Sequence, residues 1–454
     1  MKRVIFIFTT LILLCTAVFP QKITGTWNGT LDYGTFKLRI VFHIEEKNGV
    51  YSTTMDSPDQ GAKDIQTAST VFKSKKLTIN MPKLFAVFEG KVSKNSIEGT
   101  FTQMGKAAPL VLVRGNVDYN RPQDPKPPFP YHVENVFFNN EKADITLAGT
   151  FTYPEAGDNF PAVVLITGSG AQNRDEELFN HRPFAVIADY LTRNGIAVLR
   201  YDDRGTAESK GIYHTATIQD FAADALSAVS YLKTRNEINP QKIGLIGHSE
   251  GGTIAFMLAG GGNDLAFIVS MAGSAIKGDS LMKLQRHLIS SAMGIPSKQI
   301  AENEELVEKM TETVEKHTAD SVFNYPELFI DEIIPVQLAG NAAVRKSLTS
   351  ELVKIASPEI YSLMMYDPTE DLQKINCKVF AINGEKDLQV PADINLGNVE
   401  KYVKGASIKK YPNLNHLFQT SKTGLVTEYV EIEETISPEV LEDIKNWIQK
   451  IVNE

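Results

Sequence analysis

Residues 22–115 alternate between hydrophobic and polar positions in short runs. The clearest runs are Thr35–Ile44, Lys75–Ile79, Ala86–Val92 and Ile97–Thr102. Alternation with a period of two is typical of strands that bury one face, and turn residues such as Lys47-Asn48-Gly49 separate the runs. The pattern predicts a small antiparallel all-β domain, a barrel or a sandwich, over residues 22–115.

A proline-rich segment follows this region. Residues 116–132 contain prolines at positions 122, 125, 127, 128 and 130. Proline has no backbone N–H to donate to a sheet ladder, and proline-rich chains favour an extended, semi-rigid form. We therefore predict a linker here, with a second domain over residues 133–454.

Hydrophobic strand candidates alternate with helical patterns in this second region. Two early runs, Val133–Phe138 and Ile145–Tyr153, predict an opening hairpin. The later strand candidates are Ala162–Thr167, Ala197–Tyr201, Lys242–Ile246, Ala266–Met271, Lys378–Asn383 and Ser407–Tyr411. Hydrophobic residues recur at helical spacing over Ile218–Leu232 and again over Val440–Ile451. Together they predict an α/β domain built on a doubly wound, mostly parallel sheet.

One long interval interrupts this alternation. Residues 275–372 have helical character and are rich in Glu, Lys, Met and Leu, yet they lie between two successive strand candidates. A crossover between neighbouring parallel strands needs far fewer residues. The interval predicts an inserted helical cap over the carboxyl edge of the sheet, where ligands bind in open α/β folds.

Composition and charge narrow the class of protein. The chain has 454 residues, of which 43% are hydrophobic and 22% are charged, as in an ordinary globular protein. The formal net charge is −9, and outside the first three residues no dense run of Lys or Arg occurs. Because phosphate binding needs a basic patch, the sequence argues against a nucleic-acid partner.

The N-terminus has the layout of an export signal. Lys2-Arg3 precedes a hydrophobic run, Val4–Leu14, that is too short to span a bilayer. We predict a signal peptide over residues 1–21 and no integral membrane span. Leu14 is large where a lipoprotein signal needs a small residue before Cys15, which argues against a lipid anchor. The mature protein is expected to be periplasmic or extracellular.

The segment Gly247-His248-Ser249-Glu250-Gly251 is the strongest candidate for chemistry. It follows the hydrophobic run Ile243–Ile246 and precedes the helix-like Thr253–Leu258. A serine between glycines on a sharp turn from strand to helix has the layout of a nucleophile elbow. The bare pentapeptide is weak, since roughly one chain in eight would contain it by chance. The prediction depends on its setting and on its partners.

A serine hydroxyl needs a base to take its proton and a carboxylate to orient that base. In this kind of fold the chain order is nucleophile, acid, base, with the last two on loops after late strands. His416 directly follows the last strand candidate, whereas His287 and His317 fall in the cap, so His416 is the predicted base. Asp387 is the predicted acid, with Glu385 as the alternative.

The oxyanion of an acyl-transfer intermediate needs prearranged N–H donors. One is expected to be the amide of Glu250, directly after the nucleophile, and the other that of Ser169 in the turn Gly168-Ser169-Gly170. His248 is predicted to be a packing residue beside the site.

Two groups of acidic residues are further candidates for a metal site or a substrate-binding site. The pair Asp202-Asp203 lacks further ligands at metal spacing, so we predict that this segment supports the site through salt bridges of Arg204 and that no metal is bound. The cap glutamates are predicted to form a solvated helix face or, in a peptidase, to hold a substrate ammonium group: Glu302, Glu304, Glu305 and Glu308.

Five segments in order resemble the α/β-hydrolase superfamily, and within it the bacterial carboxylesterases grouped with serine aminopeptidase-like hydrolases. They are residues 168–175, 201–205, 247–252, 384–387 and 415–416. The resemblance covers residues 133–454 apart from the cap. It implies hydrolysis of short or medium acyl esters without a cofactor. Thr206–Ser209 replaces a glycine common in that group, and Asn173 stands where Asp is common.

The sequence therefore predicts a secreted serine hydrolase that cleaves small-molecule carboxylic esters through an acyl-enzyme. Two alternatives remain open. One is a serine aminopeptidase-type enzyme acting on aminoacyl or peptide substrates, suggested by the acidic cap. The other is an envelope protein that binds a glycan or a lipid through its β-domain.

Overall fold

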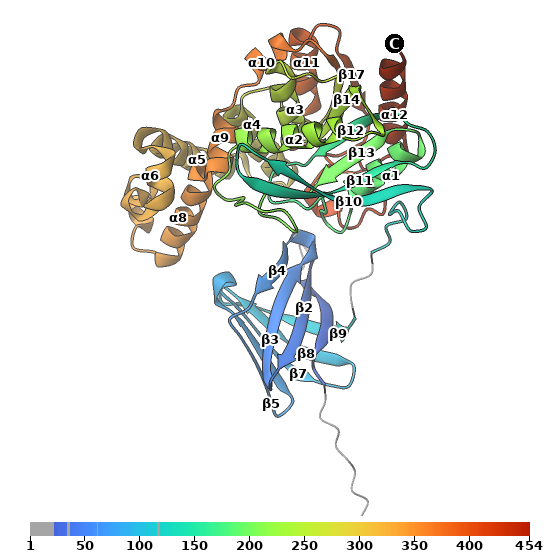
Figure 1. The fold of residues 1–454 in the computed structure, drawn as a ribbon. Coiled ribbons are helices and arrows are strands. Elements are labelled where there is room, and N and C mark those ends of the chain that lie inside the picture. Colours follow the sequence, from blue (N-terminus) through green and yellow to red (C-terminus); the bar gives the residue numbers. More distant parts are fainter. Residues whose placement is uncertain (1–21, 34–36, 61, 116–118) are drawn as a thin grey trace, which may run out of the picture. The chain divides into compact units, whose positions relative to one another are not determined.

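The computed structural model describes residues 22–33, 37–60, 62–115 and 119–454, so the predicted signal peptide at residues 1–21 lies outside the described residues. The chain divides into two compact units, residues 1–118 and residues 119–454 (Figure 1). No helix among the described residues is both long enough and hydrophobic enough to cross a bilayer.

The first unit is one antiparallel sheet of nine strands, in the order β4-β3-β2-β1-β9-β8-β7-β6-β5. The strands are β1 (Gly25–Asp32), β2 (Lys37–Lys47), β3 (Val50–Ser57), β4 (Ala62–Gln66), β5 (Ser69–Lys73), β6 (Lys76–Met81), β7 (Ala86–Val92), β8 (Ser96–Gln103) and β9 (Lys106–Arg114), with short 3-10 turns η1 (Pro58–Gln60) and η2 (Pro82–Leu84). Alternate residues such as Trp27, Phe42 and Phe88 fill its core. The prediction of an antiparallel all-β region is confirmed.

The second unit is built on an eight-stranded sheet, in the order β10-β11-β13-β12-β14-β15-β16-β17. Its strands are β10 (Tyr131–Asn140), β11 (Ile145–Pro154), β12 (Phe160–Ile166), β13 (Ala197–Tyr201), β14 (Ile238–His248), β15 (Phe267–Met271), β16 (Lys378–Gly384) and β17 (Ser407–Tyr411). The pairs β10·β11 and β11·β13 are antiparallel, and the other pairs are parallel. The predicted doubly wound, mostly parallel sheet is confirmed.

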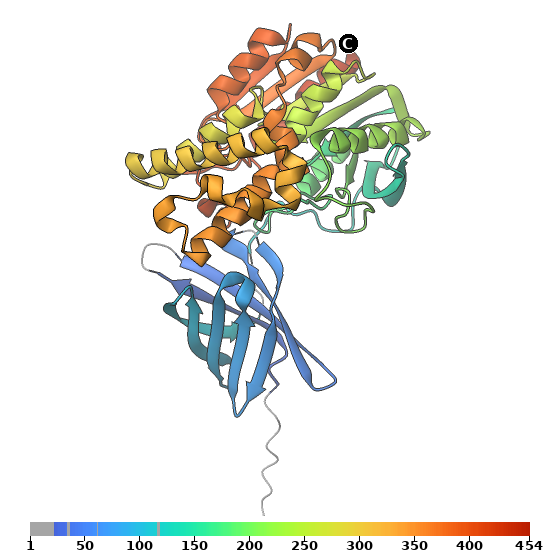
Figure 2. The same ribbon diagram turned by 90° about the vertical axis from the view of Figure 1, so that its left-hand side faces the viewer.

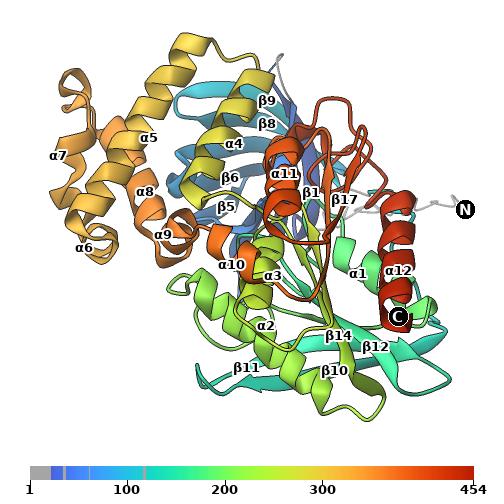
Figure 3. The same cartoon turned by 90° about the horizontal axis from the view of Figure 1, so that it is seen from above.

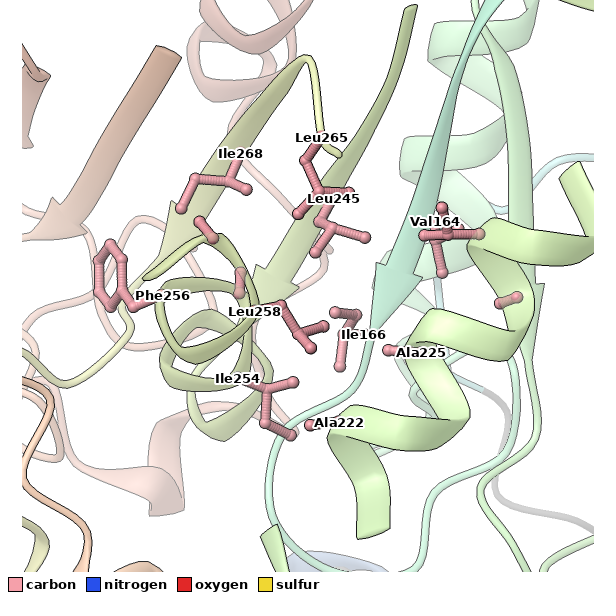
Figure 4. Close-up of a cluster of buried hydrophobic side chains, with 14 of the residues drawn as sticks. Val164, Ile166, Ala222, Ala225, Leu245, Ile254, Phe256, Leu258, Leu265 and Ile268 are labelled. Carbon is pink, nitrogen blue, oxygen red and sulfur yellow. The ribbon is translucent and has the colours of Figure 1, made fainter. Parts of the chain in front are cut away.

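Helices cover both faces of this sheet (Figure 3). One face packs against α1 (Pro183–Arg193) and α12 (Pro438–Asn453), and the other against α2 (Ile218–Lys233), α3 (Glu250–Gly260) and α11 (Ala392–Tyr402). Successive residues of a strand point to opposite faces, so Val164 packs toward α2 and α3 while Val163 packs toward α1 and α12. Figure 4 shows the first of these cores, in which the following side chains meet: Val164, Ile166, Ala222, Ala225, Leu245, Ile254, Leu258 and Ile268.

The cap lies between β15 and β16, and Figure 2 shows its helices gathered together. Its elements are α4 (Gly278–Ala292), α5 (Ser297–His317), α6 (Ala319–Asn324), η3 (Pro326–Leu328), α7 (Ile330–Ile333), η4 (Val336–Leu338), α8 (Ala342–Ala356), α9 (Pro358–Met365) and α10 (Thr369–Lys374). A separate hydrophobic core that includes Met310, Val314 and Leu352 holds it together. The predicted helical insertion is confirmed.

The proline-rich segment differs from the predicted linker. Residues 119–132 belong to the second unit, because Arg121 docks them there. Its guanidinium donates to the carbonyl oxygens of Ile432 at 2.8 Å, Val430 at 3.0 Å and Phe179 at 3.1 Å. A high proline content indicates that a segment cannot pair in a sheet. It does not indicate whether side chains anchor that segment to a neighbouring domain.

This anchor leads to a prediction about stability. We expect Arg121→Ala to lower the free energy of unfolding by about 2–4 kcal/mol, because several carbonyl groups lose a charged donor in a buried place. The matched control is Arg193→Ala, since Arg193 is 43% exposed, forms an ion pair with Asp189 four residues earlier in the same helix and lies 5.7 Å from the centroid of the Tyr131 ring; its expected cost is below about 1 kcal/mol. Urea unfolding measures both, and equal effects of the two variants would contradict the anchor.

Candidate active site

Ser249 occupies the turn between β14, which ends at His248, and α3, which begins at Glu250. Its φ of 54° and ψ of −117° are strained for a residue with a side chain. The flanking glycines allow the strand and helix to approach closely enough to impose this turn. A Cβ at Gly247 would lie 2.0 Å from the Gly251 carbonyl oxygen, and one at Gly251 would lie 2.1 Å from that of Ile166. The segment thus has the backbone form of a nucleophile elbow.

The predicted base and acid are hydrogen-bonded to each other. His416 Nδ1 lies 2.7 Å from Asp387 Oδ2, and both side chains are buried. The other oxygen of Asp387 accepts from the backbone N–H groups of Gln389 and Val390, each at 2.8 Å. These bonds hold the carboxylate so that it orients the imidazole. Glu385, the alternative acid, is exposed and accepts only from the Asn413 backbone N–H among the described hydrogen bonds.

His248 connects the elbow to the loop that carries His416. Its Nε2 lies 3.0 Å from the His416 carbonyl oxygen, its Nδ1 lies 2.9 Å from Glu176 Oε1, and the two histidine rings are 4.8 Å apart between centroids. Burial disfavours the charged form of His248, but the Glu176 carboxylate outweighs it and raises the pKa of the ring. His248 is therefore a hydrogen-bonded link, which is more specific than the packing role predicted from the sequence.

The described hydrogen bonds do not include one between the Ser249 hydroxyl and His416. Bonds of this kind are often long or poorly aligned before substrate binds. His248 holds the Ser249 turn close to the loop that carries His416, because it directly precedes Ser249 and hydrogen-bonds to the backbone carbonyl of His416.

The turn Gly168-Ser169-Gly170 lies against the elbow. A Cβ at Gly168 would be 3.2 Å from Ser249 Cβ. The Gly168 N–H donates to Glu176 Oε1 at 2.7 Å and the Gly170 N–H to Glu359 Oε1 at 3.2 Å. Within the described hydrogen-bond set, the N–H groups of Ser169 and Glu250 have no such acceptor, and both residues line the same cavity as Ser249. These two amides are the predicted oxyanion donors.

The Glu250 side chain adds an unusual charge beside these amides. It is 6% exposed, and its Oε2 atom is buried without a hydrogen-bond partner among the described residues. Burial, followed by the nearby carboxyls of Glu359 and Asp203, raises the pKa of Glu250 to about 8. The side chain is therefore predominantly neutral at pH 7, which keeps negative charge away from the oxyanion position.

The segment Asp202-Asp203-Arg204 fastens the neighbouring loops. Asp203 accepts from the Thr167 hydroxyl and the Gln172 backbone N–H, each at 2.8 Å, and burial raises its pKa to about 8. Arg204 Nε bonds to Asp224 of α2 at 2.6 Å. The described residues contain no group of three or more His, Cys, Asp or Glu side chains placed to hold a metal ion.

The cap glutamates do not line the cavity at Ser249 within the described residues. They pair on the surface of α5 with nearby basic side chains: Glu302 with Lys298, Glu304 with His287, Glu305 with Lys309 and Glu308 with Lys283. This arrangement agrees with the predicted solvated helix face, and the alternative role in holding a substrate ammonium group stays a prediction. The carboxylates that do line the cavity include Glu359, which no sequence motif marked, and Glu250.

The cavity has a volume of about 770 Å³, within the range of small-molecule sites. Ser169, Ser249 and Glu250 line one part of it, and the cap helices α4, α5, α8 and α9 supply much of the remaining wall. A small-molecule substrate in this cavity therefore contacts both the elbow and the cap.

Parts of the chain are similar to known proteins. Residues 181–330 match a family model described as "Serine aminopeptidase, S33". Esterase EstD of Thermotoga maritima is 38% identical over 114 residues, which cover 24% of this chain and 27% of the esterase. The protein YfhR of Escherichia coli strain K12 is 30% identical over 138 residues, 30% of this chain and 45% of YfhR. The matched part thus spans between about a quarter and a half of these relatives.

Solved structures with similar folds include the α/β hydrolase GrgF from Penicillium sp. sh18, with a TM-score of 0.45 and 18% identity over 71% of this chain and 100% of that one. Another is Est1E from Butyrivibrio proteoclasticus with ferulic acid bound, with a TM-score of 0.42 and 15% identity over 70% of this chain and 100% of that one. The second unit has the α/β-hydrolase fold. Within that superfamily its family match is to the S33 serine aminopeptidase-like hydrolases, and an esterase is among its relatives.

The raised pKa of Glu250 predicts a pH-dependent contribution to stability. Its folded-state pKa of about 8 exceeds the ordinary value of 4.5, so the native state binds the proton more tightly than the unfolded state. The associated stability is complete below pH 4.5 and is lost as pH rises toward 8, at about 1.4 kcal/mol per pH unit. Glu250→Gln removes this loss of stability at high pH, because glutamine has no proton to release.

We therefore expect the variant to gain stability relative to the native protein when both move from pH 5 to pH 9. Urea unfolding at the two pH values measures the change. Glu302→Gln is the matched control, because Glu302 is on the exposed face of α5. A native-to-variant difference that is the same at both pH values would show that Glu250 has no raised pKa.

Proposed function

We propose that this protein is a serine carboxylesterase that acts on small-molecule esters of short to medium acyl chain length. The observation that carries the proposal is the strained Ser249 turn, linked through His248 to the hydrogen-bonded pair His416 and Asp387. A nucleophile, its base and the group that orients the base are the parts that acyl transfer needs.

In the proposed reaction, Ser249 Oγ attacks the ester carbonyl carbon while His416 Nε2 takes the hydroxyl proton. The amides of Ser169 and Glu250 hold the oxyanion of the tetrahedral intermediate. The C–O bond to the alcohol then breaks, and the imidazolium returns its proton to the leaving oxygen. Water, activated by the same imidazole, hydrolyses the acyl-enzyme and restores the Ser249 hydroxyl. Asp387 accepts from His416 Nδ1 and thereby keeps His416 Nε2 free for each transfer.

We also propose that the enzyme is exported. The support is the sequence pattern of residues 1–21, a basic start followed by a short hydrophobic run. Fractionation of cells that express the full chain tests this, and a product that keeps residues 1–21 and remains inside the cell would refute it.

The activity is tested with 4-nitrophenyl esters of increasing acyl length, alongside aminoacyl 4-nitroanilides. We expect the esters to be hydrolysed and Ser249→Ala to lower kcat by about 10³-fold or more, because the nucleophile is lost. Equal rates for the two proteins would reject the proposed nucleophile. Cleavage of the anilides but not of the esters would instead assign a peptidase activity.

The role of Asp387 is separated from that of Glu385 by paired amide substitutions. We expect Asp387→Asn to lower kcat by about 10³–10⁴-fold, because an amide holds the wrong tautomer of His416, while KM changes little. Glu385→Gln, which alters an exposed carboxylate, is expected to stay within about twofold of the native rate, as surface substitutions generally do. A larger loss in Glu385→Gln than in Asp387→Asn would reverse the assignment.

A further inference from the structure

The cap contributes an arginine to a part of the cavity that hydrophobic side chains line together with polar and charged ones, among them Thr311, Glu351 and Lys354. Arg286 lies on α4, in the wall that this helix shares with α5 and α9. The hydrophobic side chains around the cap part of the cavity are Leu281, Met282, Val307, Phe323, Ile360 and Leu363. Hydrocarbon walls of this kind fit an acyl chain, but an acyl chain alone gives no reason for a charged guanidinium among them.

Arg286 has no partner within the described part of the chain. Its Nε atom is buried without a hydrogen bond, and no described ion pair includes its guanidinium. The buried or half-buried arginines elsewhere in this domain are paired: Arg174 with Asp202, Arg200 with Asp175, Arg204 with Asp224 and Arg235 with Glu134. A half-buried, unpaired charge is costly, so its retention calls for an anion that the chain itself does not provide.

The nearby carboxylates do not fill this role. Glu304 and Glu351 act on Arg286 only at a distance, and burial, which is the largest effect, lowers the pKa of Arg286. Glu304 accepts instead from His287 Nδ1 at 3.0 Å. Glu351 lines the cavity but is exposed, and no described hydrogen bond or ion pair joins it to Arg286. Glu359, which also lines the cavity, accepts from the Gly170 N–H and the Tyr213 hydroxyl.

The position of Arg286 is tied to the catalytic loops. Gln285, the preceding residue, donates from Nε2 to Gln389 Oε1 at 3.3 Å. Gln389 in turn donates its backbone N–H to Asp387. This turn of α4 is therefore fastened to the loop that carries the predicted acid, and a ligand at Arg286 lies in the same cavity as Ser249.

We infer that Arg286 binds the carboxylate of the substrate, and that the preferred substrates are esters whose acyl chain ends in a free carboxylate. The guanidinium presents a planar fork of donors that fits a carboxylate, and the hydrocarbon walls fit the methylene groups between the carboxylate and the ester. The inference rests on the proposed esterase function and gives its substrate class.

The test compares two esters that differ only at the chain end: 4-nitrophenyl hexanoate and the mono-4-nitrophenyl ester of adipic acid. We expect the native enzyme to prefer the adipate ester in kcat/KM. Arg286→Met is expected to lower kcat/KM for the adipate ester by about 30-fold, because one charge-assisted pair is lost, and to leave the hexanoate ester within about threefold. Arg286→Lys is expected to restore part of the preference.

The matched control is Lys283→Met on the same helix. Lys283 is exposed and pairs with Glu308, so this variant is expected to keep the native preference. Equal loss on both esters in Arg286→Met would show a structural role and overturn the inference, as would a native enzyme that prefers hexanoate.

Binding separates this inference from the proposed function. Titration calorimetry with monomethyl adipate, using Ser249→Ala protein so that no turnover occurs, is expected to show binding that Arg286→Met abolishes. If neither ester is hydrolysed but monomethyl adipate binds through Arg286, the esterase proposal fails and the carboxylate site stands. If hexanoate is hydrolysed but monomethyl adipate does not bind, the esterase stands and the carboxylate site fails.

Discussion

The close approach of β14 and α3 is the constraint on which the active site depends. At Gly247 and Gly251 there is no room for a side chain beside the neighbouring backbone, so strand and helix meet through a turn that only a strained residue completes. That residue is Ser249. The strained turn places the Ser249 hydroxyl and the first amide of α3 on the same side of the sheet edge, and the packing of α3 against β14 and β15 maintains this geometry.

Hydrogen bonds to buried carboxyl groups then position the remaining parts. Glu176 holds both the Gly168 amide and His248, and His248 reaches the His416 backbone. One carboxylate thereby connects the predicted oxyanion turn, the elbow and the base loop. Asp203 also holds the segment after this turn, because it accepts from the Gln172 backbone N–H. Several acidic groups are thus crowded behind the site, and the raised pKa values of Asp203 and Glu250 follow from that crowding and from burial.

Hydrophobic periodicity predicted the α/β sheet well, because parallel strands buried on both faces are continuous hydrophobic runs. In the first unit the named runs correspond to β2, β6, β7 and β8, and no run was named for β1, β3, β4, β5 or β9. Polar residues such as Ser52 and Lys63 lie within some of these strands. The sequence order of Ser249, Asp387 and His416 allowed them to be predicted as one site, because each follows a strand and the ends of these strands meet at one edge of the sheet. The sequence did not predict that three further residues belong to the site: Glu176, Glu359 and Arg286. Their places in the site come from the tertiary structure, which no local motif records.

The Gly170 N–H bond to Glu359 has a consequence for how such enzymes diversify. Glu359 lies in the first turn of α9, the cap helix that follows α8, yet it accepts a hydrogen bond from the same turn that presents Ser169. Through this bond the cap helps to hold the turn that carries one of the two predicted oxyanion amides. A cap exchanged between relatives would alter turnover as well as substrate choice unless the incoming helices carried an equivalent acid at that spot.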